Sequence, residues 1–264
     1  MEKETFFLVV DGLRIRGEYY IPKSTRRILY PGICLCHGIP GRIKDLKDRG
    51  YKLLAQKFCK EGFVVLIFNF RGAGESDGNF DISGWARDLT AVIDSFFKQP
   101  WVDKERISLM GFSGGAAVSM FVTAQDKRIS HLVTCACPSE FNFINEPEKV
   151  ALFINQARGI GIIREQTYPP SLKEWLAGFK KISPIRWVDK ISPRPILIIH
   201  GSNDEVVDIG HAWKLYEKAK NPRDILIVDG ASHRLRIHEE AMNGAIYWLK
   251  KVDSTSLDTH QKHP

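Results

Sequence analysis

The segment 106–124 holds a five-residue pattern that leaves the chain little choice of local structure. Residues 111–115 read G-F-S-G-G, with an apolar run before them and a run of small residues after them. This arrangement predicts a strand that ends near Met110, a sharp turn, and a helix that begins at Gly114. A Cβ atom at Gly111 or Gly115 would collide with the neighbouring backbone. The glycines therefore allow Ser113 to stand at the tip of a strained turn, with its hydroxyl exposed above the sheet.

Apolar strand-like runs alternate with amphipathic helices over most of the 264 residues. Asp11-Gly12 between two alternating runs predicts a hairpin. The run 63–68 is continuously apolar, which is typical of a parallel strand covered on both faces. The pattern predicts an α/β fold with a mostly parallel central sheet, an N-terminal antiparallel hairpin and helices on both faces. The expected strands are 5–10, 13–21, 27–36, 63–68, 106–110, 131–136, 195–200 and 225–228, and the expected helices are 48–60, 85–96, one from 114, 209–220 and 235–252.

The alternation stops between residues 138 and 193, where prolines and aromatic residues are frequent. A stretch of this length without a clear strand predicts an excursion from the sheet, interpreted as an inserted cap, or lid. We expect a core made of 1–137 and 194–252, the cap at 138–193, and a flexible C-terminal tail at 253–264 because that end is polar and aperiodic.

A serine hydroxyl needs a neighbouring base and a third group that orients this base. Asp204 follows the strand run 195–200, and His233 follows the strand run 225–228. In an open parallel sheet, such partners come from loops at the carboxyl ends of strands. The order Ser113, Asp204, His233 is one of the known orders of the triad. We therefore expect these three side chains to be catalytic.

Other acids and imidazoles near these positions are weaker candidates. Asp208 opens the next helix and is expected to cap it. Glu205 is expected to point away from the site, and His211 and His238 are expected on helix surfaces. The histidines His37 and His200, which end strands just before glycines, are expected to brace loops.

Acyl transfer also requires N–H donors for the oxyanion of the tetrahedral intermediate. One expected donor is the backbone N–H of Gly114, directly after Ser113. The other is expected in the loop H-G-I-P-G at 37–41, where the N–H of Ile39 is the chosen donor.

The composition limits other functions. The net charge of +7 includes a basic cluster at 42–52 that two aspartates interrupt, so it is interpreted as a solvated face and not as a nucleic-acid site. The five cysteines form two C-x-C pairs, Cys34/Cys36 and Cys135/Cys137, each expected on one face of a buried strand. Their odd number and the absence of an export signal favour reduced thiols in a cytoplasm, and C-x-C lacks the spacing of structural zinc. No membrane span is expected.

Five motifs occur together in the order of a known superfamily: H-G-I-P-G at 37–41, N-F-R-G-A-G-E-S-D-G at 69–78, G-F-S-G-G at 111–115, H-G-S-N-D-E-V-V at 200–207 and G-A-S-H at 230–233. Over about residues 5–252 the chain resembles the α/β hydrolases of the capped esterase, lysophospholipase and serine-aminopeptidase-like branch. Region 63–90 is similar to cinnamoyl and feruloyl esterases. Phe112 stands where many relatives carry histidine, which bears on pocket shape. The resemblance implies a carboxylic ester substrate.

The predicted activity is that of a serine esterase acting on small-molecule esters, without cofactor or metal, as a monomer or homodimer. A peptidase that releases N-terminal residues remains open, since Glu140, Glu146, Glu148 or Glu165 in the cap could hold a substrate ammonium. A thioesterase or lactonase is open on the same triad. A binding protein that lost its chemistry is a further alternative. Dinucleotide binding is disfavoured because the third glycine after G-A-G falls one position late.

Overall fold

A mixed sheet of eight strands, in the order β1-β2-β4-β3-β5-β6-β7-β8, organises the molecule. The computed structural model describes residues 1–23, 29–41 and 50–260, with side chains as far as residue 254. β1 pairs antiparallel with β2, β2 pairs antiparallel with β4, and the remaining pairs are parallel. The strands are β1 (Glu2–Val10), β2 (Leu13–Ile21), β3 (Tyr30–Cys36), β4 (Val64–Phe68), β5 (Val102–Phe112), β6 (Ile129–Cys135), β7 (Ile196–Gly201) and β8 (Arg223–Val228).

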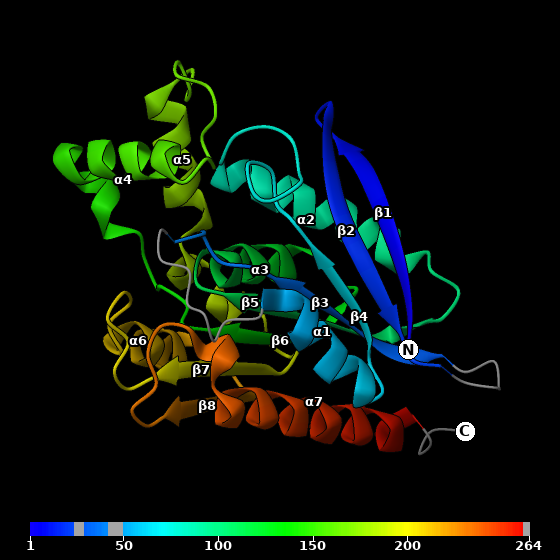
Figure 1. Ribbon diagram of the computed structural model, residues 1–264. Helices are drawn as coiled ribbons and strands as arrows, with labels where there is room; N and C mark the ends of the chain where they lie inside the picture. The colour runs from blue at the N-terminus through cyan, green and yellow to red at the C-terminus, as the bar shows by residue number, and fades with distance from the viewer. Residues whose placement is uncertain (24–28, 42–49, 261–264) are drawn as a thin grey trace.

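Helices cover both faces of this sheet, as Figure 1 shows. α1 and α7 pack on one face, while α2, α3 and α6 pack on the other. The helices are α1 (Gly50–Lys60), α2 (Ile82–Phe97), α3 (Gly114–Gln125), α4 (Pro147–Gly159), α5 (Leu172–Ile182), α6 (Gly210–Lys218) and α7 (Glu239–His260), with short 3₁₀ turns η1 (Asn142–Asn145), η2 (Pro184–Arg186), η3 (Val188–Lys190) and η4 (Leu235–Ile237). The predicted fold class is confirmed.

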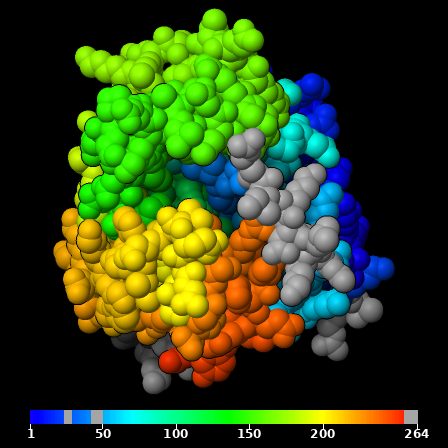
Figure 2. All heavy atoms as spheres, turned by 60° about the vertical axis from the view of Figure 1, so that its left-hand side comes forward, coloured from blue at the N-terminus to red at the C-terminus, as the bar shows by residue number. Residues whose placement is uncertain are grey.

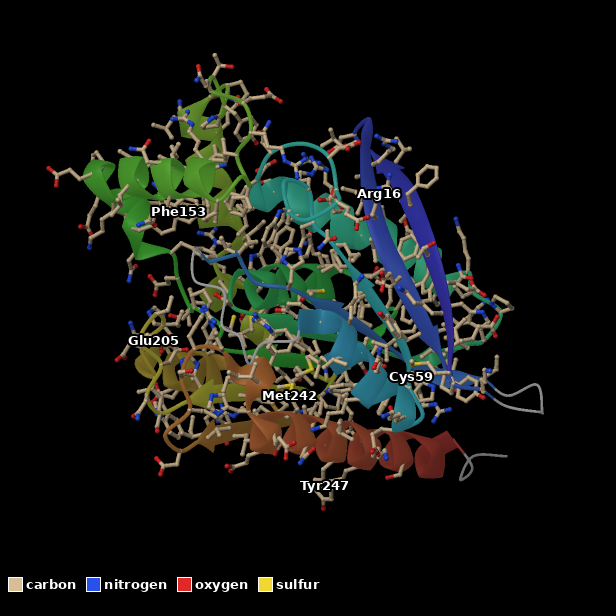
Figure 3. The ribbon with its side chains drawn as sticks, in the orientation of Figure 1. Arg16, Cys59, Phe153, Glu205, Met242 and Tyr247 are labelled. Carbon is tan, nitrogen blue, oxygen red and sulfur yellow. The ribbon has the colours of Figure 1, made fainter. Side chains whose placement is uncertain are left out.

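Local sequence signals account for several of these elements. Asp11 and Gly12 both have positive φ (51° and 78°), the conformation that a two-residue hairpin turn requires. All five residues of β4 are buried, as expected for a parallel strand between two helical layers. Trp85 of α2 is fully buried in the core. Met242 of α7 faces the sheet and Tyr247 points away from it (Figure 3), with exposed fractions of 2% and 72%.

The C-terminal region differs from its prediction. The expected helix 235–252 is divided, because the 3₁₀ turn η4 precedes α7 and only α7 is α-helical. Within the segment 253–264, expected as a flexible tail, the helix α7 continues to His260. Asp253 is 7% exposed, and its Oδ1 lies 3.5 Å from Nδ1 of His131 in β6. Asp253 is therefore a buried residue of α7 and not the first residue of a solvated tail.

Asp253→Asn is expected to stabilise the protein at neutral pH. Burial raises the pKa of Asp253 from 3.8 to about 6. The folded state thus binds this proton more tightly than the unfolded chain, so the stabilisation is complete below about pH 4 and is lost as the pH rises through 6. Two pKa units correspond to about 3 kcal/mol, which asparagine would recover in large part at pH 7.5.

Urea unfolding of both forms at pH 7.5 and pH 4 measures this effect. The gain is expected to be about 2–3 kcal/mol at pH 7.5 and below about 1 kcal/mol at pH 4. An equal difference at the two pH values would contradict the assignment of the effect to the Asp253 carboxyl group.

Candidate active site

Ser113 occupies the predicted turn between β5 and α3. Its backbone has φ 50° and ψ −121°, a strained conformation for a residue with a side chain. The N–H of Ser113 donates to the carbonyl of Cys135 at 2.8 Å, which ties the turn to β6. A Cβ at Gly111 would lie 2.5 Å from Cα of Ala116, and one at Gly115 would collide with carbonyl oxygens of the loop after β3. The predicted reason for both glycines is confirmed.

The loop after β3 lies directly against Ser113. A Cβ at Gly38 would lie 3.1 Å from Cβ of Ser113. At Gly114, a Cβ would lie 2.9 Å from Cγ1 of Ile39 and 3.7 Å from its nitrogen. The main chains of Ile39 and Gly114, the two expected donors, are therefore neighbours beside Ser113.

His37 braces this loop, as predicted. Its Nε2 accepts a hydrogen bond from the N–H of Phe70 at 3.1 Å, so Nδ1 carries the proton and donates to the carbonyl of Gly38 at 2.7 Å. Burial lowers the pKa of His37 to about 4. The imidazole therefore stays neutral and keeps both bonds above that pH.

Asp204 and His233 form a direct pair. Nδ1 of His233 lies 2.9 Å from Oδ2 and 3.0 Å from Oδ1 of Asp204, whose side chain is fully buried. The N–H groups of Val206 and Val207 donate to Oδ1 at 2.9 and 2.8 Å. Burial alone would raise the pKa of Asp204, but these hydrogen bonds outweigh it and lower the pKa. The carboxylate thus stays ionised, which fixes the proton of His233 on Nδ1 and leaves Nε2 as a free base.

A second imidazole lies against the same carboxylate. His200, which is fully buried in β7, donates from Nε2 to the carbonyl of Val207 at 2.8 Å. The same Nε2 lies 3.3 Å from Oδ2 of Asp204. His200 therefore braces the loop that carries the acid, as the sequence predicts.

Ser113 and His233 lie at the same carboxyl edge of the sheet, on the loops of β5 and β8. No hydrogen bond joins the Ser113 hydroxyl to His233 in the described structure. Contacts through Arg236 connect the two loops: its guanidinium lies 5.1 Å from the ring centre of Tyr51, which packs edge-on against Phe112 at 5.4 Å. Figure 2 shows a hollow on this side of the molecule, between the green segment of 138–160, the yellow start of α6 and the orange segment after β8.

The segment between β6 and β7 is fastened to the loop after β4. Oδ1 of Asn79 accepts hydrogen bonds from the N–H groups of Arg164 and Glu165 at 2.7 and 3.1 Å. The guanidinium of Arg164 donates to the carbonyls of Ser76, Gly72 and Gly74. Side chain to backbone contacts of this kind hold both segments as one body.

The remaining sequence candidates lie as follows. Asp208 accepts from the N–H of Gly210 at 2.8 Å at the start of α6, but the N-cap residue of this helix is Ile209 and not Asp208 as expected. His211 is not a surface residue: it is half-buried, and Nδ1 accepts from the N–H of Ser139 at 3.0 Å. His238 lies between η4 and α7 and is half-buried. Glu205 does not point away from the site, because Oε2 accepts from the backbone N–H of His233 at 3.2 Å.

Both Glu205 and His211 were missed for the same reason. Each bonds a backbone N–H from a segment 28 or 72 residues away in the chain. Neither bond leaves a periodicity or spacing in the sequence that could reveal it. The available signal was that Glu205 directly follows Asp204, in the loop after β7, the strand that pairs with β8.

The cysteines are free and buried, and the two C-x-C pairs differ. Cys34 and Cys36 lie on one face, with sulfur atoms 4.0 Å apart. Cys135 and Cys137 pack on opposite faces because Ala136 has φ 51°, so the expectation of one shared face is wrong for this pair.

Within the described ranges, no group of three or more His, Cys, Asp or Glu side chains could hold a metal ion. The basic residues at 42–49 lie outside those ranges, and Lys52 pairs with Glu18 at 3.1 Å.

The model of the prolyl oligopeptidase family matches residues 50–252, a range that includes Ser113, Asp204 and His233. The chain belongs to the prolyl oligopeptidase family. Together with the fold, this membership makes it an α/β hydrolase. No helix in the described part of the chain has the length and apolarity that crossing a bilayer demands.

Individual relatives are diverse. The chain is 29% identical to an uncharacterized peptidase, YtmA, of Bacillus subtilis, covering 82% of this chain and 79% of that protein. It is 29% identical to the thiohydrolase aneE of Aspergillus aculeatus, covering 76% and 60%. Among solved structures, the α/β hydrolase GrgF from Penicillium matches with a TM-score of 0.73 at 20% identity, covering 95% of this chain and 99% of that one. Est1E from Butyrivibrio proteoclasticus with bound ferulic acid matches with a TM-score of 0.69 at 19% identity, covering 96% and 99%.

Proposed function

We propose that the protein is a serine hydrolase that cleaves carboxylic esters through an acyl-enzyme on Ser113. His233 acts as the general base, and Asp204 orients it. The observation that carries the proposal is the 2.9 Å contact between Nδ1 of His233 and the buried carboxylate of Asp204. It lies at the same sheet edge as the strained turn of Ser113. Acyl transfer requires a serine hydroxyl with an imidazole base that a carboxylate orients.

In this reaction Nε2 of His233 takes the proton of the Ser113 hydroxyl as the oxygen attacks the ester carbonyl. The imidazolium donates this proton to the leaving alcohol, and the acyl group stays on Ser113. Water then attacks the acyl-enzyme with the same base, which releases the acid. Asp204 remains ionised throughout, because its hydrogen-bond donors, the N–H groups of Val206 and Val207 and Nδ1 of His233, favour the anion.

The N–H groups of Ile39 and Gly114 are the proposed oxyanion donors. The adjacency of their main chains beside Ser113 supports this role. Each such donor contributes about 10²–10³ in turnover when aligned with the developing charge. These donors are backbone N–H groups. The size of the side chains at positions 38 and 114 therefore decides whether the substrate oxygen can reach them.

Residues 138–193 form the proposed cap above the core of 1–137 and 194–252. Half-exposed aromatic rings on it, Phe143 and Phe153, stack with centroids 4.9 Å apart. Phe153 lies on the side of α4 that faces the core (Figure 3). This supports a small-molecule ester with an apolar group as substrate.

Covalent labelling tests the proposal. A fluorophosphonate probe is expected to modify the wild type at Ser113, as peptide mass spectrometry would identify, and to leave Ser113→Ala unlabelled. Turnover of p-nitrophenyl esters is expected to fall by about 10⁴–10⁶ in that variant, because the remaining groups cannot supply a nucleophile. Ser254→Ala, which removes an exposed hydroxyl of α7, is the matched control and should label normally.

A panel of leaving groups separates the alternatives on the same triad. Esters are expected to exceed the thioester of N-acetylcysteamine and aminoacyl p-nitroanilides in kcat/KM. A preference for the anilides would favour a peptidase, and a preference for the thioester would favour a thioesterase. Full ester turnover by Ser113→Ala would overturn the proposed mechanism.

A further inference from the structure

The loops after β7 and β8 are joined along their length by hydrogen bonds. The N–H of Ser202 donates to the carbonyl of Val228 at 3.0 Å, and the N–H of Gly230 donates to Oγ of Ser202 at 2.7 Å. The N–H of Asn203 donates to the carbonyl of Ala231 at 3.0 Å. These hydrogen bonds fix the position of the loop after β8, which carries His233, relative to the loop after β7, which carries Asp204.

Glu205 makes the last contact of this series, and it reaches His233 itself. Oε2 of Glu205 accepts from the backbone N–H of His233 at 3.2 Å, while Asp204 holds the imidazole. Two consecutive carboxylates thus bind one residue, one at the main chain and one at the ring. On the other side, the carbonyl of His233 accepts from the N–H of Leu235 at 2.9 Å.

We infer that Glu205 is a positioning residue that fixes the main chain of His233 and adds negative charge beside the catalytic base. This inference rests on the proposed function. The bond holds the Cα of His233 at the distance from which Nδ1 reaches Asp204, so that Nε2 is aimed at Ser113. The charge favours the imidazolium that forms when His233 takes the serine proton.

Glu205 can be substituted without disturbing the core of the protein. Glu205 is exposed and lies at the end of the molecule where β7 and β8 terminate (Figure 3). No core packing is lost when it is replaced, so the fold should persist. Glu205→Gln keeps an acceptor oxygen and removes the charge, whereas Glu205→Ala removes both.

Glu205→Ala is expected to lower kcat for p-nitrophenyl esters by about threefold to tenfold with KM unchanged, the size of one ordinary hydrogen bond lost at an exposed site. Glu205→Gln should stay within about twofold of the wild-type kcat, because its amide oxygen still accepts the N–H of His233. In both variants the acid limb of the kcat/KM profile should move to lower pH, because the imidazolium loses a neighbouring anion. A merely structural role would not move that limb.

The control is Glu217→Ala, which removes an exposed carboxylate of α6 away from the two loops. It should match the wild type in kcat and in pH profile. The inference is overturned if Glu205→Ala behaves like this control, or if its loss appears in KM with the acid limb unmoved. Ser113→Ala is measured alongside: an inactive Ser113→Ala with an unaffected Glu205→Ala rejects only the role of Glu205, while an active Ser113→Ala rejects the triad.

Discussion

Asp204→Asn is expected to lower the kcat for esters by about 10⁴-fold, the loss that this exchange causes in a serine protease. The backbone N–H groups of Val206 and Val207 point at Oδ1 and require an acceptor there. The amide oxygen of asparagine therefore takes that place, and its NH₂ group takes the place of Oδ2. This donor would face Nδ1 of His233, 2.9 Å from Oδ2 in the native protein.

The consequence is the wrong tautomer of the base. Nδ1 of His233 would become an acceptor, Nε2 would carry the proton, and the Ser113 hydroxyl would find no base. Stopped assays of p-nitrophenyl ester turnover over pH 5–9 measure the loss.

Asp208→Asn provides the control in the same loop. Asp208 accepts from the N–H of Gly210 at the start of α6, and an asparagine oxygen can accept the same bond. Its kcat should remain close to that of the wild type. If Asp204→Asn kept more than about a tenth of the wild-type kcat, Asp204 would not be the group that orients His233.

The parts of the site that sequence could predict are those encoded in neighbouring residues. The turn at Ser113 follows from glycines at two fixed positions around it, since the collisions they avoid are local. Asp204 could be proposed because it comes directly after a buried strand, and parallel strands bring their carboxyl ends to one edge. The pairing of Asp204 with His233 then follows from the adjacency of β7 and β8.

The parts that sequence could not predict depend on distant segments. Asn79 binds the backbone of residues 164 and 165, and His211 binds the backbone of Ser139. Such bonds require a side chain and a main-chain group that only tertiary structure brings together. The end of α7 was placed too early because Asp253 reads as a polar tail residue, although burial beside His131 gives it a place in the core.

Asp88→Ala is expected to destabilise the protein by about 3–5 kcal/mol, because it leaves a buried cation without its main partner. Asp88 is fully buried in α2 and accepts from Nη2, Nε and the backbone N–H of Arg71 at 2.7, 3.1 and 2.9 Å. Arg71 is only 5% exposed. Without Asp88, the half-exposed Asp11 is the one carboxylate left on this guanidinium among the described residues.

The effect should also reach the active site. Arg71 lies in the loop after β4, which Asn79 and Arg164 fasten to the segment between β6 and β7, so its release would loosen both segments together. Chemical denaturation with far-UV circular dichroism gives the free energy of unfolding, and the KM for esters reports on any change at the proposed substrate site. Lys149→Ala, which breaks the exposed pair with Glu146, should cost less than about 1 kcal/mol and leave KM unchanged. An Asp88→Ala protein as stable as Lys149→Ala would mean that the buried pair contributes no more than a surface pair, and that the loop is held by its backbone contacts alone.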